Sequence, residues 1–561
     1  MSHHKRRTAV AGACAAVVAT GLIPLATAHA QAQGPQVQKA GTGHVLLISV
    51  DGLHQSDLTS YVKAHPRSTL ASLVANGTSY THAQTPIPSD SFPGMVAQVT
   101  GGNPGTTGIY YDDTYNHALL PANHALLPAG TTSCKGVTPG AEVNYTEALD
   151  KDPLSLDAGQ GLLGLPASIL SMTGQPRALL NAALLPVDPR TCAPVYPHSY
   201  LKVNTVFDVL SNHGLRTAWS DKHPAYEILN GPSGNGIQDL FTPEINSQAA
   251  GSKAGNDWTK DNAKTQQYDG YKVRAVLNEI DGYDHSRSTE VGMPALLGMN
   301  FQSVSTGQKL PTSGGQPGGY NADGTPGPVL TGALSFVDRA VATMVAELKG
   351  RQELQSTTII LSAKHGQSPV EPRALTRIPD GPILDGLNAA WAAGHPGAAQ
   401  LVVQSTDDDA MIMWLSDRSQ AAADFAKAYL LHHNGIGNDI NGNPRPFTAP
   451  GLTNVYAGKD SAAFFGTRVG DPRVPDLYAF AQHGVVFTGG MGKLAEHGGA
   501  DPQDRNVPLV VSGASTEAGT SSSTTVETTQ IAPTILRLLG LSPSELQAVQ
   551  IEGTKSLPLK R

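Results

Sequence analysis

Residues Pro86 to Gly101 read PIPSDSFPGMVAQVTG, and the rest of the chain is best understood by working outward from them. Pro86 and Pro88 favour an extended loop, because a residue that precedes proline avoids helical angles. Ser91 is typical of a helix N-cap, and the apolar residues after it recur at helical spacing until Gly101 ends the run. The stretch therefore predicts a loop that turns into a helix at Ser91.

A hydroxyl group at this position has two interpretations. The simple one is a capping serine that satisfies the first N–H groups of its helix. The functional one is a nucleophile that attacks an anionic phosphate, because unpaired N–H donors and the positive end of the helix dipole meet there. This stretch alone is compatible with both.

The composition indicates a large globular protein. The chain has 561 residues, a hydrophobic content of 40% and a formal net charge of −8. A chain of this length can bury a large core, and big α/β enzymes often reach it as one domain. The acidic balance gives no electrostatic basis for nucleic acid as the main partner.

Residues 1–30 have the features of a secretory signal peptide. Basic residues up to Arg7 precede a mostly apolar stretch, and the segment from Ala28 to Ala30 fits a cleavage site before Gln31. We therefore expect a secreted protein, extracellular or periplasmic, exported by the general or the twin-arginine route. No later stretch approaches the 18 apolar residues of a membrane span.

Removal of the signal peptide would leave two cysteines, Cys134 and Cys192. In an exported protein two cysteines most simply form one disulfide. Neither lies in a CxxC motif or beside a histidine, so a metal-binding or catalytic cysteine is the less favoured alternative.

The mature chain is predicted to form one large domain with flanking segments. Residues 31–43 are a polar, flexible lead-in, and the domain spans residues 44–541. A loop-rich insertion at about 110–200 and a cap-like insertion at about 370–490 interrupt it. Residues 542–561 are expected to be a C-terminal tail.

Three apolar runs predict strands that are buried on both faces of a parallel sheet, and polar residues follow each of them. The runs and their polar followers are His44 to Val50 with Asp51, Ala295 to Phe301 with Gln302 and Gln308, and Thr357 to Ser362 with Lys364 and His365. Ligands of open α/β sheets bind at the edge where parallel strands end. Together with Ser91 and His497, these residues have the chemistry of a metal-assisted hydrolase, since Zn²⁺ takes imidazole and carboxylate ligands. A turn-capping aspartate and structural histidines are the alternatives.

Five segments carry a family resemblance. They are VLLISVDGL at 45–53, TPIPSDSFPGMVAQVTGGNPGTTGI at 85–109, TIILSAKHGQ at 358–367, EHGG at 496–499 and TTQIAPTILRLLGL at 528–541. In this order they resemble the alkaline phosphatase superfamily, and within it the type I phosphodiesterase/nucleotide pyrophosphatase family. The resemblance implies an α/β fold with a central, mostly parallel sheet, helices on both faces and an inserted cap region.

The resemblance also implies roles for four residues. Ser91 matches the nucleophile, usually threonine in this family, which forms a covalent phosphoseryl-type intermediate that water hydrolyses. Asp51 matches a metal ligand at the end of the first strand. His365 and His497 match two histidine ligands.

Four other positions depart from the family pattern. Lys364 replaces a metal-binding aspartate, Gln302 and Gln308 stand in the loop that supplies an aspartate and a histidine, and Asp112 replaces an asparagine that holds a phosphoryl oxygen. Neutral amides bind metal weakly, and a lysine could hold positive charge where a metal would sit. We therefore expect one divalent metal, Zn²⁺, rather than two, or a metal-poor site in which Lys364 stabilises the transition state. Asp112 would repel phosphate unless it is protonated or metal-bound.

The expected function is a secreted hydrolase of phosphoric esters that acts on a small-molecule phosphate ester or nucleotide. Diesters or pyrophosphates are the favoured substrates. A phosphomonoesterase or phosphonate hydrolase of the same superfamily is one alternative. A degenerate member that binds a ligand without turnover is the other, and bound metal would distinguish it from the enzyme.

Overall fold

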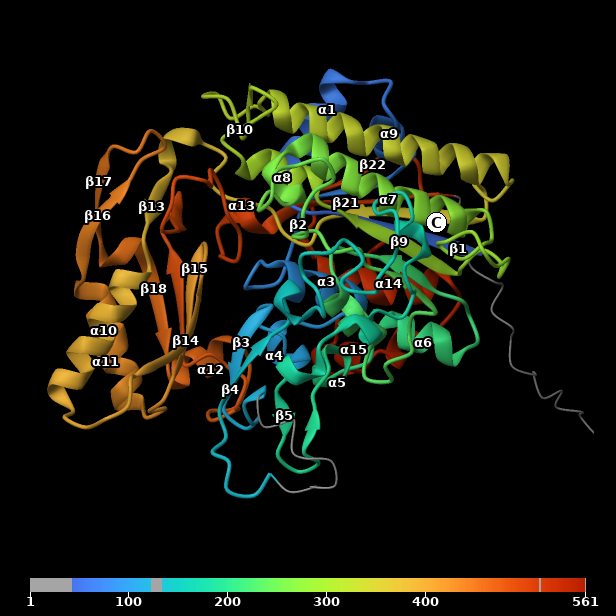
Figure 1. The fold of residues 1–561 in the computed structure, drawn as a ribbon. Coiled ribbons are helices and arrows are strands. Elements are labelled where there is room, and N and C mark those ends of the chain that lie inside the picture. Colours follow the sequence, from blue (N-terminus) through green and yellow to red (C-terminus); the bar gives the residue numbers. More distant parts are fainter. Residues whose placement is uncertain (1–42, 123–133, 514–515, 560–561) are drawn as a thin grey trace, which may run out of the picture. The chain divides into compact units, whose positions relative to one another are not determined.

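The computed structural model describes residues 43–122, 134–513 and 516–559 (Figure 1). The predicted signal peptide lies outside the described residues, and so does the lead-in up to residue 42. All described residues fall within one structural unit that spans residues 40–561.

The centre of this unit is a mostly parallel sheet, to which the described chain contributes nine strands. β1 (His44–Val50) lies between β12 (Thr357–Ser362) and β9 (Leu296–Phe301) and is parallel to both. β7 (Ala218–Ser220) and β8 (Asp239–Phe241) continue the parallel arrangement beyond β9. The strands predicted from apolar runs are therefore neighbours in the order β12, β1, β9.

The other half of the sheet contains antiparallel pairs. β21 (Asn506–Ser512) is antiparallel to β12 and to β2 (Gly77–Gln84). β22 (Thr520–Ser522) and β23 (Val526–Glu527) then pair parallel with β2 at the edge.

Helices cover both faces of the sheet, as predicted. Val45 and Leu47 of β1 belong to one hydrophobic core, and Leu46 and Ile48 belong to the other. Because both faces of β1 are buried, its apolar run is continuous rather than alternating. The helices of the first core include α3 (Ser91–Thr100), α6 (Val206–Asn212) and α14 (Ile531–Leu538), and those of the second include α1 (Gln55–Ala64), α7 (Asn262–Ile280) and α9 (Pro328–Gly350).

Within the described part of the chain, α9 alone is long and apolar enough to cross a membrane, judged by length and composition. Its residues Leu334, Val337, Val341 and Leu348 are buried in the second core. An apolar stripe of this kind is typical of a helix that packs on a sheet. The length of α9 is therefore explained by its place in the core.

The cap-like insertion has its own architecture (Figure 1). Its strands form two four-stranded sheets, and its helices α10 (Gly381–Gly394) and α11 (Gln420–His432) pack into a separate hydrophobic core. The strands of the two sheets are β17 (Pro444–Thr448), β16 (Asn434–Asn438), β13 (Thr376–Ile378) and β20 (Val485–Phe487), and β14 (Val402–Asp407), β15 (Ala410–Leu415), β19 (Leu477–Ala481) and β18 (Leu452–Ala457).

Two peripheral regions complete the unit. Residues 110–200 hold only short elements where they are described, such as β3 (Asp113–Asn116) and β4 (Ala141–Asn144), and a disulfide joins Cys134 to Cys192 as expected. The segment predicted as a tail instead contains α15 (Gln547–Glu552), which contacts α3. Leu546, the N-cap of α15, and Ala548 are buried because they pack into the first core.

Candidate active site

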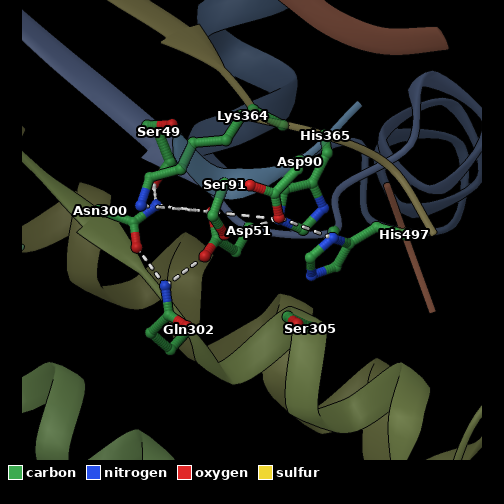
Figure 2. A network of polar contacts seen from close by, with 12 residues as sticks. Ser49, Asp51, Asp90, Ser91, Asn300, Gln302, Ser305, Lys364, His365 and His497 are labelled. Carbon is green, nitrogen blue, oxygen red and sulfur yellow. Dashed lines mark hydrogen bonds and ion pairs between the residues drawn. The ribbon is translucent and has the colours of Figure 1, made fainter. Parts of the chain in front are cut away.

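Four parallel strands end at one edge of the sheet, and polar residues follow each of them. Asp51 follows β1, Gln302 follows β9, Lys364 comes two residues after β12, and Lys222 comes two residues after β7. Since parallel strands place their carboxyl ends at the same edge, these side chains are brought toward one region. Figure 2 shows three of them, Asp51, Gln302 and Lys364, beside Ser91.

Ser91 is the first residue of α3, and the N-cap is Asp90, not Ser91 as predicted. The Asp90 carboxylate accepts a hydrogen bond from the backbone N–H of Phe92 at 3.0 Å. Either residue type can cap a helix, and here the one with the extended backbone does so. The Ser91 hydroxyl therefore has no capping role, while Gly101 ends the helix in a left-handed conformation as predicted.

Ser91 lines a cavity of about 440 Å³. Its Oγ lies 3.1 Å from Nε2 of His365 and accepts a hydrogen bond from Nζ of Lys222 at 3.2 Å. The hydroxyl thus sits between an imidazole nitrogen and an ammonium group at the start of a ten-residue helix. These are surroundings that favour a negatively charged group next to Ser91.

Asp51 is held by hydrogen bonds and by positive charge. Its Oδ1 accepts from Nδ2 of Asn300 at 2.9 Å, and its Oδ2 accepts from Nε2 of Gln302. Nζ of Lys364 lies 3.8 Å from Oδ1. Burial would raise the pKa of Asp51, but Lys364 and the nearby donors outweigh it and hold that pKa well below its usual value. Asp51 is therefore a buried carboxylate.

The rings of His365 and His497 lie against each other, with centroids 3.8 Å apart and planes tilted by 32° (Figure 2). Nδ1 of His365 lies 2.8 Å from the carbonyl oxygen of Gly366. Burial, together with the neighbouring His497, lowers the pKa of His365 well below its usual value, so the neutral imidazole is favoured. Nδ1 of His497 lies 3.2 Å from Oδ1 of Asp90, which links the late loop to the start of α3.

Lys364 lies deeper than the sequence suggested. It is fully buried, and its Nζ donates to Oδ1 of Asp221 at 3.0 Å and to the hydroxyl of Tyr226 at 2.9 Å. It is not among the described residues that line the cavity. Lys364 is therefore a buried counter-ion of Asp51 and Asp221, and it does not itself face the cavity.

Lys222 is the lysine that reaches the cavity beside Ser91. Burial would lower the pKa of Lys222, but nearby carboxylates, of which Asp51 contributes most, outweigh it and raise that pKa. The group is therefore an ammonium ion at neutral pH, placed to contact an anion that binds next to Ser91.

Asp112 also lines the cavity. Burial, reinforced by the carboxylate of Asp90, raises the pKa of Asp112 well above its usual value. The protonated form is favoured, and a protonated carboxyl group can donate a hydrogen bond to a phosphoryl oxygen. Protonation is one of the two conditions under which we expected Asp112 not to repel phosphate.

The predicted metal ligands do not fit a divalent cation. Both oxygens of Asp51 are engaged by amide donors, and Gln302 turns its N–H group, not its oxygen, toward that carboxylate. The ammonium of Lys364 adds a positive charge next to Asp51. Across residues 43–122, 134–513 and 516–559, no group of three or more His, Cys, Asp or Glu side chains is arranged to hold a metal. The donor set favours ammonium groups in this place.

Gln308 lies in a different network from the other predicted ligands. It is fully buried, and its Nε2 donates to the carbonyl of Gly52 at 2.8 Å and to the hydroxyl of Tyr320 at 2.9 Å. It is not one of the described cavity-lining residues. Gln308 therefore holds the loop after β1 in place. The sequence spacing of Gln308 from β9 could not distinguish this structural role from that of a metal ligand.

Sequence reasoning missed Lys222 and Asn300 as site residues. Asn300 is the penultimate residue of β9, inside an apolar run, and its amide contacts Asp51. Lys222 follows the short strand β7 in the sequence WSDKHP at 219–224. The signal that could have found Lys222 is the same one that found Asp51, namely polar residues directly after a strand of the parallel sheet.

Comparisons with known proteins show which family models match this chain. The type I phosphodiesterase / nucleotide pyrophosphatase family model matches residues 45–126, and the sulfatase family model matches residues 164–541, more than half of the chain. No curated protein sequence matches the chain.

Solved structures show a similar fold. Murine ectonucleotide pyrophosphatase / phosphodiesterase 5 (ENPP5, NPP5) is 12% identical with a TM-score of 0.52, over 89% of this chain and 96% of its own. An inactive variant of that murine protein in complex with AMP gives the same values. The wild-type alkaline phosphatase PafA is 14% identical with a TM-score of 0.57, over 90% of this chain and 97% of its own. At such identities the likeness concerns the fold.

Proposed function

Since this chain belongs to the alkaline phosphatase superfamily, in its nucleotide pyrophosphatase/phosphodiesterase-like family, we propose that it hydrolyses phosphoric esters with Ser91 as the nucleophile. The observation that carries this proposal is the position of the Ser91 hydroxyl. It lies at the start of α3, on the wall of the cavity, in contact with Nε2 of His365 and Nζ of Lys222. A hydroxyl placed between a basic nitrogen and a fixed positive charge is typical of a nucleophile that attacks an anion.

The substrate class follows from the cavity. A volume of about 440 Å³ is in the range of small-molecule sites. Lys222 would bind one phosphoryl oxygen, and the protonated carboxyl of Asp112 would donate a hydrogen bond to another. The AMP complex of the murine structure supports a nucleotide or another small phosphate ester. Diesters or pyrophosphates are our proposed substrates, and monoesters or phosphonates are the alternatives that the assay below separates.

The test is hydrolysis of bis-p-nitrophenyl phosphate and p-nitrophenyl phosphate by the mature protein and by Ser91→Ala. We expect cleavage of the diester, and a loss of kcat of roughly 10³-fold or more in Ser91→Ala, since the nucleophile is removed. Ser91→Thr keeps a hydroxyl and should retain part of the activity. If neither substrate is cleaved under any condition, the chain is a binding protein of this family; full activity in Ser91→Ala would instead exclude Ser91 as the nucleophile.

We also propose that the protein is exported. The predicted signal at residues 1–30 supports this, and so does the disulfide between Cys134 and Cys192, because disulfides persist in oxidising compartments. Expression of the full chain in a secreting host should release a protein whose N-terminus is Gln31. Retention of the intact N-terminus inside the cells would contradict export.

A further inference from the structure

To attack a phosphate ester, Ser91 needs a base that takes its proton and a positive charge that stabilises the phosphoryl oxygens. The predicted metal ligands do not fit a divalent cation, so other groups must provide both. We propose that this site transfers the phosphoryl group without a bound metal ion. Nε2 of His365 takes the proton of Ser91, and the ammonium of Lys222 stabilises the charge on the phosphoryl oxygens. This inference rests on the proposed function and assigns two groups that act in it.

The hydrogen bonds of His365 define which of its nitrogens is basic. Nδ1 lies 2.8 Å from the carbonyl oxygen of Gly366, and a carbonyl can only accept. Nδ1 therefore carries the proton of the neutral ring, and Nε2 presents its lone pair to Oγ of Ser91 at 3.1 Å. The ring of His497, in contact with this imidazole, helps to hold its orientation.

The hydrogen bonds of Ser91 agree with that tautomer. Nζ of Lys222 has no lone pair when charged, so Oγ of Ser91 accepts from it at 3.2 Å. The remaining partner of Ser91 is Nε2 of His365, toward which the hydroxyl proton must point. Lys222 also disfavours the neutral hydroxyl relative to the alkoxide, because it places a positive charge next to the developing negative one.

Lys222 differs from the other cavity lysines in its partners. Lys309 pairs with Glu496 at 2.7 Å, and Lys493 pairs with the same carboxylate. In the described part of the chain, no carboxylate oxygen forms a direct ion pair with Nζ of Lys222; Asp51 acts on it only from a greater distance, and its direct hydrogen bond goes to Oγ of Ser91 on the cavity wall, where an anion can pair with it. The buried Lys364 instead balances Asp51 and Asp221, which makes it a positioning residue.

The reaction balances over two steps. In the first, a lone pair of Ser91 Oγ forms the bond to phosphorus, its proton passes to Nε2 of His365, and the bond from phosphorus to the leaving oxygen breaks, so that the leaving group departs as an anion. In the second, water forms a bond to phosphorus and releases its proton to solvent. The bond between phosphorus and Ser91 Oγ then breaks, and His365 returns its proton to Ser91. The net change is hydrolysis of one ester bond.

The test uses mature protein that has been dialysed against EDTA and analysed for metal by mass spectrometry. We expect substoichiometric metal, unchanged hydrolysis of bis-p-nitrophenyl phosphate, and a covalent adduct on Ser91 in the acid-quenched protein. The adduct is measured by intact mass and is a readout separate from turnover.

Variants then test the two assigned groups. Lys222→Met should lower kcat by roughly 10²–10³-fold, as does the loss of one donor that stabilises transition-state charge elsewhere. Lys222→Arg keeps a positive charge and should retain much more activity than Lys222→Met. His365→Ala should abolish adduct formation. Lys264→Met is the matched control, because Nζ of Lys264 bonds the Ala250 carbonyl outside the cavity, and its activity should equal that of the wild type.

Three outcomes would overturn the inference. If dialysed protein is inactive and one equivalent of Zn²⁺ restores it while Ser91→Ala stays inactive, the metal-free step is wrong and the proposed function stands. If Lys222→Met folds and keeps wild-type kcat, Lys222 has no catalytic role. If no substrate is cleaved with or without metal, the proposed function fails and the inference fails with it.

Discussion

Asp150 and Glu244 are two buried carboxyl groups that lie next to each other. They are 2% and 0% exposed, and neither oxygen of Asp150 has a hydrogen-bond partner among the described residues. Burial raises the pKa of Asp150 to about 8, and the nearby carboxylate of Glu147 contributes in the same direction. The folded protein therefore holds a proton here that the unfolded chain releases near its ordinary pKa of 3.8.

This pair predicts a stability that depends on pH. A group whose pKa is raised by folding stabilises the protein fully below its unfolded value, and that stability is lost as the pH rises through the folded value. We expect the contribution of Asp150 to the free energy of unfolding to fall by up to about 1.4 kcal/mol per pH unit between roughly pH 4 and pH 8. Urea denaturation across this range should show the slope, and Asp150→Asn should reduce it.

The exposed Asp385→Asn on α10 is the control, since it removes a carboxyl group that folding does not bury. The slope of Asp385→Asn should equal that of the wild type. An Asp150→Asn protein with an unchanged slope would contradict the raised pKa of Asp150.

The site residues that could be predicted are those whose neighbours in the sequence indicate a strand end or a helix start. Asp51 directly follows a continuous apolar run, and Ser91 stands where a proline-rich loop becomes a helix, so both could be placed at one sheet edge. Lys222 follows a strand of only three residues, and no continuous apolar run marks that strand as a buried member of the sheet. Gln308 looked like a ligand because sequence spacing does not show that its amide turns toward Gly52.

At the scale of elements, the contact between α3 and the end of β12 sets the distance from Ser91 to His365. Gly94 lies in the first turns of α3, and a Cβ at this position would run into the carbonyl oxygen of Lys364. The helix start therefore approaches the backbone as closely as a glycine allows. Any side chain at position 94 would push Ser91 away from Nε2 of His365.

We therefore expect Gly94→Ala to lower both stability and activity. Overpacking at a close contact costs about 1–3 kcal/mol, and kcat should fall because the bond between Ser91 and His365 lengthens. Urea denaturation and diester hydrolysis measure the two effects. Gly332→Ala in α9 is the matched control, because nothing lies within 4 Å of its added Cβ. That change should stabilise the protein by about 0.5–1 kcal/mol, and equal effects of the two substitutions would refute the close contact.

The elements that could be predicted are those with strong local patterns. The apolar runs of β1 and β12 and the amphipathic stripe of α9 were readable, because burial on both faces or on one face leaves a periodic signal. The sheets of the cap were not, since β13 pairs parallel with β20 more than a hundred residues later in the chain. Pairing at that separation is decided by packing that no local pattern encodes.

At the scale of the whole molecule, the cavity depends on segments that are far apart in sequence. Thr406 and Asp408 from the cap and Glu147 from the loop-rich insertion line it together with Ser91. Tyr111 donates a hydrogen bond to Oδ2 of Asp408 at 2.6 Å and so joins the cap to the loop after α4 (Pro104–Thr107). The insertions therefore complete the wall of the cavity that the sheet edge begins.

The disulfide ties the loop-rich insertion to itself across 58 residues, from Cys134 to Cys192. A crosslink over a loop of this length restricts the unfolded chain and stabilises the folded one by about 2–4 kcal/mol. The double variant Cys134→Ser/Cys192→Ser should therefore unfold at lower urea concentration, with kcat unchanged, because neither cysteine lines the cavity.

Thiol counting in denaturant provides the independent check on that bond. Mature protein without reductant should show no free thiol, and reduction should release two. A precursor that keeps its N-terminus would show one, from Cys14, so the same titration reports cleavage of the signal. Two free thiols before reduction would mean that the insertion is held by packing alone, and the double variant should then be as stable as the wild type. A loss of stability in the double variant without a change in kcat would instead show that the disulfide stabilises the fold and leaves the active site unchanged.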